Sequence, residues 1–308
     1  MNIYYTDVFT IDLPRGHRFP LQKYRALRDA VTDLGDPDLK LVIPPAVSRE
    51  LLVQVHSPVF VEAVHRGALS AEQERAIGLP WSQGLVQRSL RSVGGTVAAA
   101  QSAVQDGLSV SLAGGTHHAS YAEAAGFCVF NDVAVAACGL LQGHGAERVL
   151  IVDCDVHQGE GTAEMISGHN SIFQVSIHSA RNFPHRKSVS DIDISLPDGC
   201  GDAQYLANLR DGVESALHRF KPDFMFYIAG ADILAEDRLG RLGVSLAGAG
   251  ARDAYVLAQA AAAQLPVAVV MGGGYAEPIE KSVAVHCQTV ELAMTSWRAR
   301  RQAHNTLA

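Results

Sequence analysis

The sequence predicts an α/β fold in which helices cover both faces of a mainly parallel sheet. Apolar runs of about four to eight residues alternate with helical patterns along the chain, an arrangement typical of parallel sheets. At 308 residues, the chain suits one large α/β domain or two ordinary ones. Apolar residues make up 48% and charged residues 19%, so a sizeable core is available.

Seven segments have the apolar and β-branched character of strands, and they are NIYYTDV, LKLVI, LSVSLAG, RVLIVDCDV, SIFQVSIH, DFMFYIAG and PVAVVMGG. Helical patterns are found near residues 21–34, 86–106, 131–143, 203–220 and 248–264, with a last one after Pro278. We find no internal repeat and no long linker between them.

Five of the predicted strands end in polar or glycine-rich sequence. LSVSLAG runs into GTHHAS, RVLIV into DCDVHQGEG, QVSIH into SARNFP, DFMFYIAG into AD, and PVAVVM into GGGYA. In open α/β sheets, ligands bind outside the carboxyl ends of the strands. We therefore expect the functional site at this edge of the sheet.

Composition excludes several classes of function. The formal net charge of -7 argues against nucleic-acid binding, which needs a basic face, although a cationic substrate would be mildly attracted. The five cysteines are odd in number and lack CxxC spacing, so we expect a reduced, cytoplasmic chain. MNIYYTDVFTIDLPRGHRF is no signal peptide, and VLAQAAAAQLPVAVVMGGG, broken by Gln264 and Pro266, is no membrane span.

The segment VLIVDCDVHQGEG indicates a metal site. If the strand continues to residue 157, alternation places Asp153, Asp155 and His157 on one side. Cys154 then points the other way, and we expect it to pack in the core. Buried carboxylates need a cation or several hydrogen-bond donors, so a metal and a helix N-terminus both satisfy this motif when it is considered alone.

A second apolar strand ends in AGAD and supplies Asp232. Together, Asp155, His157 and Asp232 would form an open three-ligand site, which is typical of catalytic rather than structural zinc. The set is rich in oxygen, so Fe²⁺ and Mn²⁺ also suit it.

The segment GGTHHAS supplies His117 and His118. One imidazole beside a metal-bound water is a natural general base, and Asp153 and Glu160 are available to orient the pair. Taken alone, a histidine pair also fits a surface or ligand role. Tyr275 follows three glycines, and its hydroxyl could stabilise an oxyanion, with packing against the last helix as the alternative.

Together, GGTHHAS, GFCVFND, VDCDVHQGEGT, VSIHSARNFP, AGADILAEDRLGRLGVS and GGGY resemble the zinc-dependent histone deacetylase family, which includes acetylpolyamine amidohydrolases and acetoin-utilisation proteins. LPRGHRFPLQKY and DILAEDRLGRLGVS look most similar to the class IV branch and its bacterial relatives. The resemblance implies the arginase–deacetylase fold, as a single three-layer α/β/α catalytic domain over residues 1–308.

The resemblance also implies a role for each matching residue. Zinc would be bound by Asp155, His157 and Asp232. His117 and His118 match the tandem catalytic histidines, and Tyr275 matches the tyrosine that polarises the carbonyl. Asp153 matches the acid that orients the first histidine, and with Ser176 it falls at a structural potassium site. The acyl-lysine tunnel would be lined by Gly126, Phe127, Phe183 and Gly273.

The chain departs from the family pattern at two places. The residue paired with the second histidine is usually Asp or Asn, whereas here it is Glu160. The acidic rim residue that holds the substrate backbone in several deacetylases is not identifiable in EQERAIGLPWSQG. The sequence therefore indicates amide hydrolysis without indicating which residue would hold a peptide backbone.

The resemblance implies a zinc hydrolase that removes an acyl group from N-acyl-lysine side chains of a protein or peptide, and class IV similarity favours long acyl chains. An acetylpolyamine amidohydrolase, which acts on an acylated small amine, is the nearest alternative. A ureohydrolase would need two metals and a tight D-x-D after AGA, which is absent. A non-enzymatic, metal-stabilised binding module would have no need of His117, His118 and Tyr275.

Overall fold

A computed structural model describes residues 1–307, and its centre is one eight-stranded sheet with every neighbouring pair of strands parallel. The strand order is β2-β1-β3-β8-β7-β4-β5-β6. The strands are β1 (Asn2–Tyr4), β2 (Lys40–Val42), β3 (Leu108–Ser111), β4 (Val149–Asp153), β5 (Ile172–Ser179), β6 (Ile192–Leu196), β7 (Phe224–Ala229) and β8 (Val267–Met271).

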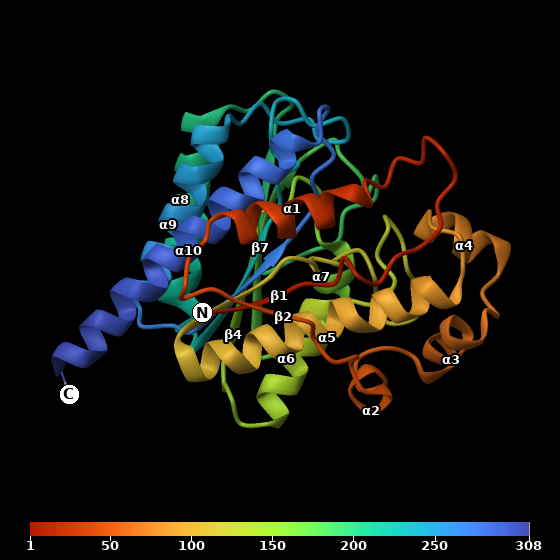
Figure 1. Cartoon of the computed structure of the whole chain (residues 1–308), viewed down its shortest axis with the longest axis horizontal. Helices are drawn as coiled ribbons and strands as arrows, with labels where there is room; N and C mark the ends of the chain where they lie inside the picture. Colours follow the sequence, from red (N-terminus) through yellow and green to blue (C-terminus); the bar gives the residue numbers. More distant parts are fainter. Residues whose placement is uncertain (308) are drawn as a thin grey trace.

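Helices cover both faces of this sheet, which confirms the predicted fold class (Figure 1). One face is covered by α1 (Gln22–Asp33), α8 (Asp202–Phe220), α9 (Leu246–Ala262) and α10 (Glu280–Leu307), which share one apolar core with the strands. A second core lies on the other face, under α5 (Gln83–Asp106), α6 (Asp132–Gln142) and α7 (Glu160–Ile166). Alternate strand residues enter alternate cores, as the period of a strand requires.

A third apolar cluster lies beyond the sheet. It joins the first turns of α5 to the short helices α2 (Arg49–Leu52), α3 (Pro58–Arg66) and α4 (Ala71–Ile77). In Figure 1 these helices are gathered at the end of the molecule that also carries the N-terminal loop. The rings of Phe19 and Phe127 meet there with centroids 5.3 Å apart, so this cluster fixes the residues beside Gly126.

The seven predicted strands are all present, but the sequence did not reveal β6 or the helices α2, α3, α4 and α7. Strand β6 lies at the sheet edge and two of its five residues are exposed, so it lacks the apolar run that marks the others. The condition that β4 continues to residue 157 is not met, and the predicted strand RVLIVDCDV is too long at its C-terminal end. The strand ends at Asp153, and Asp155 and His157 lie in the following loop. Cys154 packs in the core, as expected.

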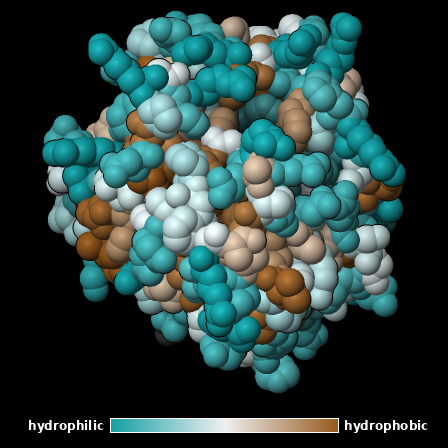
Figure 2. Space-filling model, turned by 90° about the vertical axis from the view of Figure 1, so that its right-hand side faces the viewer, coloured by the Kyte–Doolittle hydropathy of each residue, from teal (hydrophilic) through white to brown (hydrophobic). Residues whose placement is uncertain are grey.

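The surface is mixed in character. Figure 2 shows the end of the molecule that carries α4, where hydrophilic side chains surround smaller hydrophobic patches. Across residues 1–307, none of the helices combines the length and apolar character that a membrane span needs.

Candidate active site

The site is assembled from loops that follow four adjacent strands in the middle of the sheet. In the order β3, β8, β7 and β4, these loops carry the histidine pair, Gly273 with Tyr275, Asp232, and Asp155 with His157. Parallel strands bring their carboxyl ends to one edge, so residues more than a hundred positions apart meet there. The edge predicted from the strand ends is therefore the edge at which these residues gather.

Asp155, His157 and Asp232 form a buried group whose ligand atoms all lie within 4.8 Å of one another. The Nδ1 atom of His157 faces both carboxylates, at 3.0 Å from Oδ1 of Asp155 and 3.2 Å from Oδ2 of Asp232. Oδ1 of Asp232 accepts a hydrogen bond from the backbone of Val156, but Oδ2 is buried and has no hydrogen-bond partner among the described residues.

The electrostatics of this group favour a cation. Burial and the neighbouring Asp155 raise the pKa of Asp232 to about 7. Burial also opposes ionisation of Asp155, but His117 and His157 outweigh it and hold the pKa of Asp155 well below its usual value. Two close carboxylates, an imidazole nitrogen and one unsatisfied oxygen suit a divalent metal with an open coordination position.

Gly273, which follows β8, packs against the metal group, which consists of Asp155, His157 and Asp232. Its backbone N–H donates to Oδ2 of Asp155 at 2.6 Å. A Cβ atom at this position would lie only 1.9 Å from Oδ2 of Asp232, so no other residue fits without displacing that carboxylate. The glycines before Tyr275 therefore serve close approach to the metal ligands.

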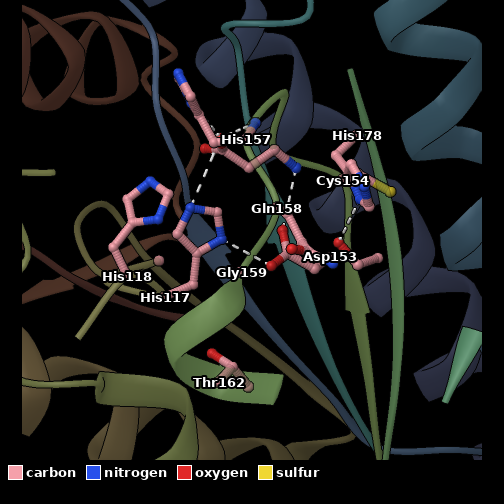
Figure 3. A network of polar contacts seen from close by, with 12 residues as sticks. His117, His118, Asp153, Cys154, His157, Gln158, Gly159, Thr162 and His178 are labelled. Carbon is pink, nitrogen blue, oxygen red and sulfur yellow. Dashed lines mark hydrogen bonds and ion pairs between the residues drawn. The ribbon is translucent and has the colours of Figure 1, made fainter. Parts of the chain in front are cut away.

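The two histidines are each held through Nδ1 by a different carboxylate. His117 Nδ1 lies 2.7 Å from Asp153, and His118 Nδ1 lies 2.6 Å from Glu160. Figure 3 shows the two rings side by side, with His117 directed at Asp153. For both histidines this contact leaves Nε2 as the nitrogen directed away from the orienting acid. The pairing expected from the sequence is thus present in the geometry.

The same arrangement shifts the pKa values of the two histidines in opposite directions. Burial and the adjacent His117 lower the pKa of His118 to about 4, although Glu160 opposes this. Burial also disfavours charge on His117, but Asp153 and Asp155 outweigh it and raise the pKa to about 10. Around neutral pH, His118 can accept a proton while His117 already carries one. Such a divergence of neighbouring groups is the pattern of an acid–base site.

These groups open on one cavity of about 350 Å³. Its lining includes His117, His118, Gly126, Phe127, Asp155, His157, Phe183, Gly273 and Tyr275. The ring centroid of Phe183 is 4.9 Å from that of His118, and the ring of Phe127 is 6.0 Å from that of Tyr275. Two aromatic walls thus lead to the metal group. Asp153, Glu160 and Asp232 are absent from the lining and lie behind it.

Tyr275 is held at the cavity by its backbone. Its N–H donates to Oδ2 of Asp237 at 2.6 Å, and the Nζ atom of Lys23 lies 5.6 Å from the ring centroid. Burial, followed by the nearby Asp232 and Asp155, raises the pKa of Tyr275, so the hydroxyl stays protonated. That hydroxyl has no hydrogen-bond partner among the described residues, and it can therefore donate to a ligand in the cavity.

Of the two remaining predicted residues, Gly126 lines the cavity and Ser176 does not. Gly126 has a φ of +55°, and a Cβ there would lie 2.5 Å from His118, so glycine allows the imidazole to reach the cavity. Ser176 lies in β5, outside the cavity lining. It pairs in register with Asp153 of β4, and its Oγ is 3.0 Å from Nδ1 of His178.

Sequence reasoning missed two groups that shape the site. Nδ2 of Asn182 lies 3.5 Å from Nε2 of His157, and Asp237 accepts from the backbone of residues 239, 240 and 275. The only available signal was their position inside VSIHSARNFP and DILAEDRLGRLGVS, two segments in which the resemblance did assign other residues.

The model of the histone deacetylase domain matches residues 17–290 of the chain. The chain belongs to the histone deacetylase family. It is therefore an amide hydrolase of the deacetylase type, and its buried Asp–His–Asp group is a candidate metal site in a family that is typically zinc-dependent. The more specific similarity to the class IV branch stays a prediction.

Individual relatives agree with this membership. An uncharacterised protein of Picosynechococcus sp. is 43% identical over 92% of this chain and 95% of its own length. Histone deacetylase 2 of Arabidopsis thaliana is 27% identical, over 90% of this chain and 74% of its own. Human histone deacetylase 1 is 32% identical over 94% of this chain, which spans 62% of that longer protein.

Solved structures of family members share the fold. The HD domain of HDA15 superposes with a TM-score of 0.80 at 21% identity, covering 96% of this chain and 91% of that one. Acetylpolyamine aminohydrolase from Burkholderia pseudomallei gives 0.78 at 22% identity, covering 95% and 98%. At these identities the likeness establishes the arginase–deacetylase fold alone.

Proposed function

We propose that this chain is a zinc-dependent lysine deacylase that hydrolyses the amide of N-acyl-lysine side chains, with residues 1–308 acting as one catalytic domain. Asp155, His157 and Asp232 would hold the zinc. One observation carries the proposal: the metal group, a neutral histidine and an unpartnered tyrosine hydroxyl converge on a narrow cavity with aromatic walls.

When bound, zinc supplies Lewis acidity that polarises the amide carbonyl and lowers the pKa of a water molecule. Nε2 of His118 accepts the proton of that water, while Glu160 holds Nδ1 of the same ring. The hydroxyl of Tyr275 donates to the oxyanion that develops on the substrate carbonyl. The histidine pair then protonates the leaving amine, with Asp153 keeping His117 charged and in place.

The cavity walls suit a lysine side chain. Phe127 and Phe183 offer apolar faces to the aliphatic stem, and Gly126 and Gly273 leave the space beside the reacting amide open. We extend the proposal to a structural potassium ion beside Asp153 and Ser176, which are paired in the β4–β5 ladder. The five cysteines are all unpaired, which supports the expectation of a cytoplasmic protein.

The test is a substrate profile of the purified protein. Acetyl-, lactoyl- and myristoyl-lysine peptides are compared with N-acetylputrescine by steady-state kinetics, before and after chelation and after zinc is returned. We expect zinc-dependent hydrolysis of at least one acyl-lysine peptide. Hydrolysis of N-acetylputrescine with no turnover of any acyl-lysine peptide would replace the proposal with acetylpolyamine hydrolysis.

A further inference from the structure

The mouth of the active-site cavity is cationic. Besides the catalytic residues, the lining contains Arg18, Arg181 and Arg241, all of them exposed. The one acidic residue in the same lining is the proposed metal ligand Asp155. The chain as a whole has a formal net charge of -7, so this concentration of positive charge runs against its composition.

Only part of this charge is neutralised by the protein itself. Asp198 lies 3.0 Å from the guanidinium of Arg241 and 3.8 Å from that of Arg181. Arg18 makes no ion pair or hydrogen bond within the described part of the chain. Two guanidinium groups therefore share one carboxylate and the third has none, which leaves the mouth positively charged.

The cationic groups come from separate segments that the fold brings together. Arg18 belongs to the N-terminal loop, Arg181 follows β5, and Arg241 follows β7. Lys187 holds the loop after β5, because its ammonium donates to the carbonyls of Asn182 and Pro184 at 2.5 and 2.6 Å. The loop that carries Phe183 into the cavity is thus also the loop that places Arg181 at the mouth.

Resting on the proposed lysine deacylase function, we propose that this mouth selects substrates that carry a carboxylate close to the acylated lysine. With the scissile amide at the metal group, the aliphatic stem lies between Phe127 and Phe183, and the lysine backbone emerges at the mouth. A guanidinium binds a carboxylate through two parallel N–H···O bonds, and the side chains of Arg181 and Arg241 are 74% and 54% exposed, so both are accessible.

Two kinds of substrate present that carboxylate. One is a peptide with Asp or Glu beside the acyl-lysine, and the other is an acyl-lysine with a free α-carboxylate. A polyamine presents the opposite charge, since its second amine is protonated and would meet the same arginines. The mouth therefore favours anionic over cationic substrates.

The experiment measures kcat/KM for acyl-lysine peptides of equal length with acidic, neutral or basic neighbours, and for a C-terminal acyl-lysine with a free or amidated carboxylate. We expect kcat/KM to be highest for peptides with acidic neighbours, lower for neutral ones and lowest for basic ones. Each contact should change kcat/KM by about 2–5-fold, as for exposed ion pairs. In about 1 M salt, where the Debye length is ~3 Å, the ratios should approach one. If only the C-terminal acyl-lysine with a free carboxylate is preferred, the arginines bind the α-carboxylate of the substrate. If peptides with internal Asp or Glu are preferred, the arginines bind the acidic side chain.

Variants assign the effect to the mouth. The combination of Arg18→Gln, Arg181→Gln and Arg241→Gln should bring the acidic-to-neutral ratio toward one, whereas Asp198→Asn should increase it. Arg186→Gln is the matched control, because Arg186 is exposed in the same loop but lines a different depression, beside Glu164 and Val189. Its ratio should match that of the wild type.

Two results would overturn the inference while leaving the proposed function intact: equal kcat/KM for acidic and neutral peptides, or a ratio unchanged in the triple variant. Failure of every acyl-lysine peptide, with turnover of N-acetylputrescine, would overturn both. Binding of labelled acyl-peptides to Tyr275→Phe gives a readout independent of turnover, and there too affinity should follow the acidic neighbours.

Discussion

Glu160 lies with Oε2 at 2.6 Å from Nδ1 of His118, although the residue at this position is shorter in the pattern that the sequence resembles. Glu160 is the first residue of α7, so its side chain starts from the turn that leads into the helix. Because the carboxylate still reaches the ring, the extra methylene is accommodated by the backbone position and does not break the contact.

Removing this contact should impair catalysis without removing the metal. We expect Glu160→Ala to lower kcat by about 10–100-fold, the usual effect of losing a partner that orients a catalytic ring. Glu160→Asn should retain part of the activity, because the amide is shorter but can still accept from Nδ1–H. Steady-state kinetics with zinc analysis checks this, and complete loss in Glu160→Asn would mean that the carboxylate itself takes part in the reaction.

His118→Ala should lower turnover by about 10²–10⁴-fold, since a positioned general base contributes that much. Zinc content should stay unchanged, because His118 is no member of the Asp–His–Asp group. His218→Ala is the control: His218 is exposed on α8, away from the cavity lining, and its loss should leave turnover near the wild-type value. Near-normal turnover in His118→Ala would remove the base from this assignment.

Asp232→Asn should have opposite effects on the metal-free and metal-loaded proteins. Without metal, a buried carboxylate whose pKa is raised to about 7 is destabilising once it ionises, so at pH 8 the amide should raise the Tm. With zinc present, the variant should bind less metal and be less stable than the wild type. Thermal melts with and without chelator, together with elemental analysis, test this; two metal ions per wild-type chain would contradict the single-site assignment.

Tyr275→Phe should separate binding from chemistry. The ring would keep its packing beside Phe127, but the donor to the developing oxyanion is lost, which typically lowers the rate by about 10²–10³-fold. Zinc content, thermal stability and acyl-peptide binding should persist. Equal rates of the two proteins at matched zinc occupancy would contradict the mechanism. A protein that binds acyl-peptides without turning over any of them, in either form, would instead act as a binding module.

His56 should make stability depend on pH. Its Nε2 accepts from the backbone N–H of Asn131 at 2.9 Å, and Nδ1 faces the carbonyl of Ser120 at 2.9 Å, so the ring is neutral. Burial lowers the pKa of His56 to about 4 from 6.5. Its contribution is complete above pH 6.5 and is lost as pH falls toward 4, because the unfolded chain then binds the extra proton.

Urea unfolding of wild type and His56→Gln at two pH values isolates this contribution. The stability difference between the two proteins should shrink by about 2 kcal/mol from pH 7 to pH 5, since the wild type alone carries the shifted group. A difference that is independent of pH would show that His56 is not held neutral.

The strands and the edge that carries the site can be predicted from the sequence. Apolar runs mark the buried strands, and the polar or glycine-rich residues that follow five of them mark the functional edge. It could not show that β8 inserts between β3 and β7, since pairing over such separations leaves no local pattern. Among the elements that were not predicted, α4 has a recognisable N-terminal signal, the capping box of Ser70 and Gln73. Strand β6 has no comparable signal in the sequence.

Within the site, the residue types were predictable but their states were not. His117 and His118 are neighbours in the chain, yet their pKa values shift in opposite directions. Burial lowers both, but Asp153 and Asp155 outweigh burial at His117, whereas burial and the adjacent His117 outweigh Glu160 at His118. Likewise, alternation does not apply beyond Asp153, where the chain leaves the sheet and turns His157 back toward Asp155. The cationic mouth could not be predicted, because its three arginines lie in loops that are far apart in the sequence and meet only in the folded protein.

The insertion of β8 also determines when the protein can become active during synthesis. Until residues 267–271 leave the ribosome, the chain can form only two separate ribbons, β2-β1-β3 and β7-β4-β5-β6, each with an unpaired inner edge. Unpaired edges are open to pairing with other chains. The donor that holds Asp155 comes from Gly273, later still. A chain that ends before residue 267 therefore carries both histidines and the proposed metal ligands, but it lacks the strand that joins the ribbon of the histidines to the ribbon of the ligands.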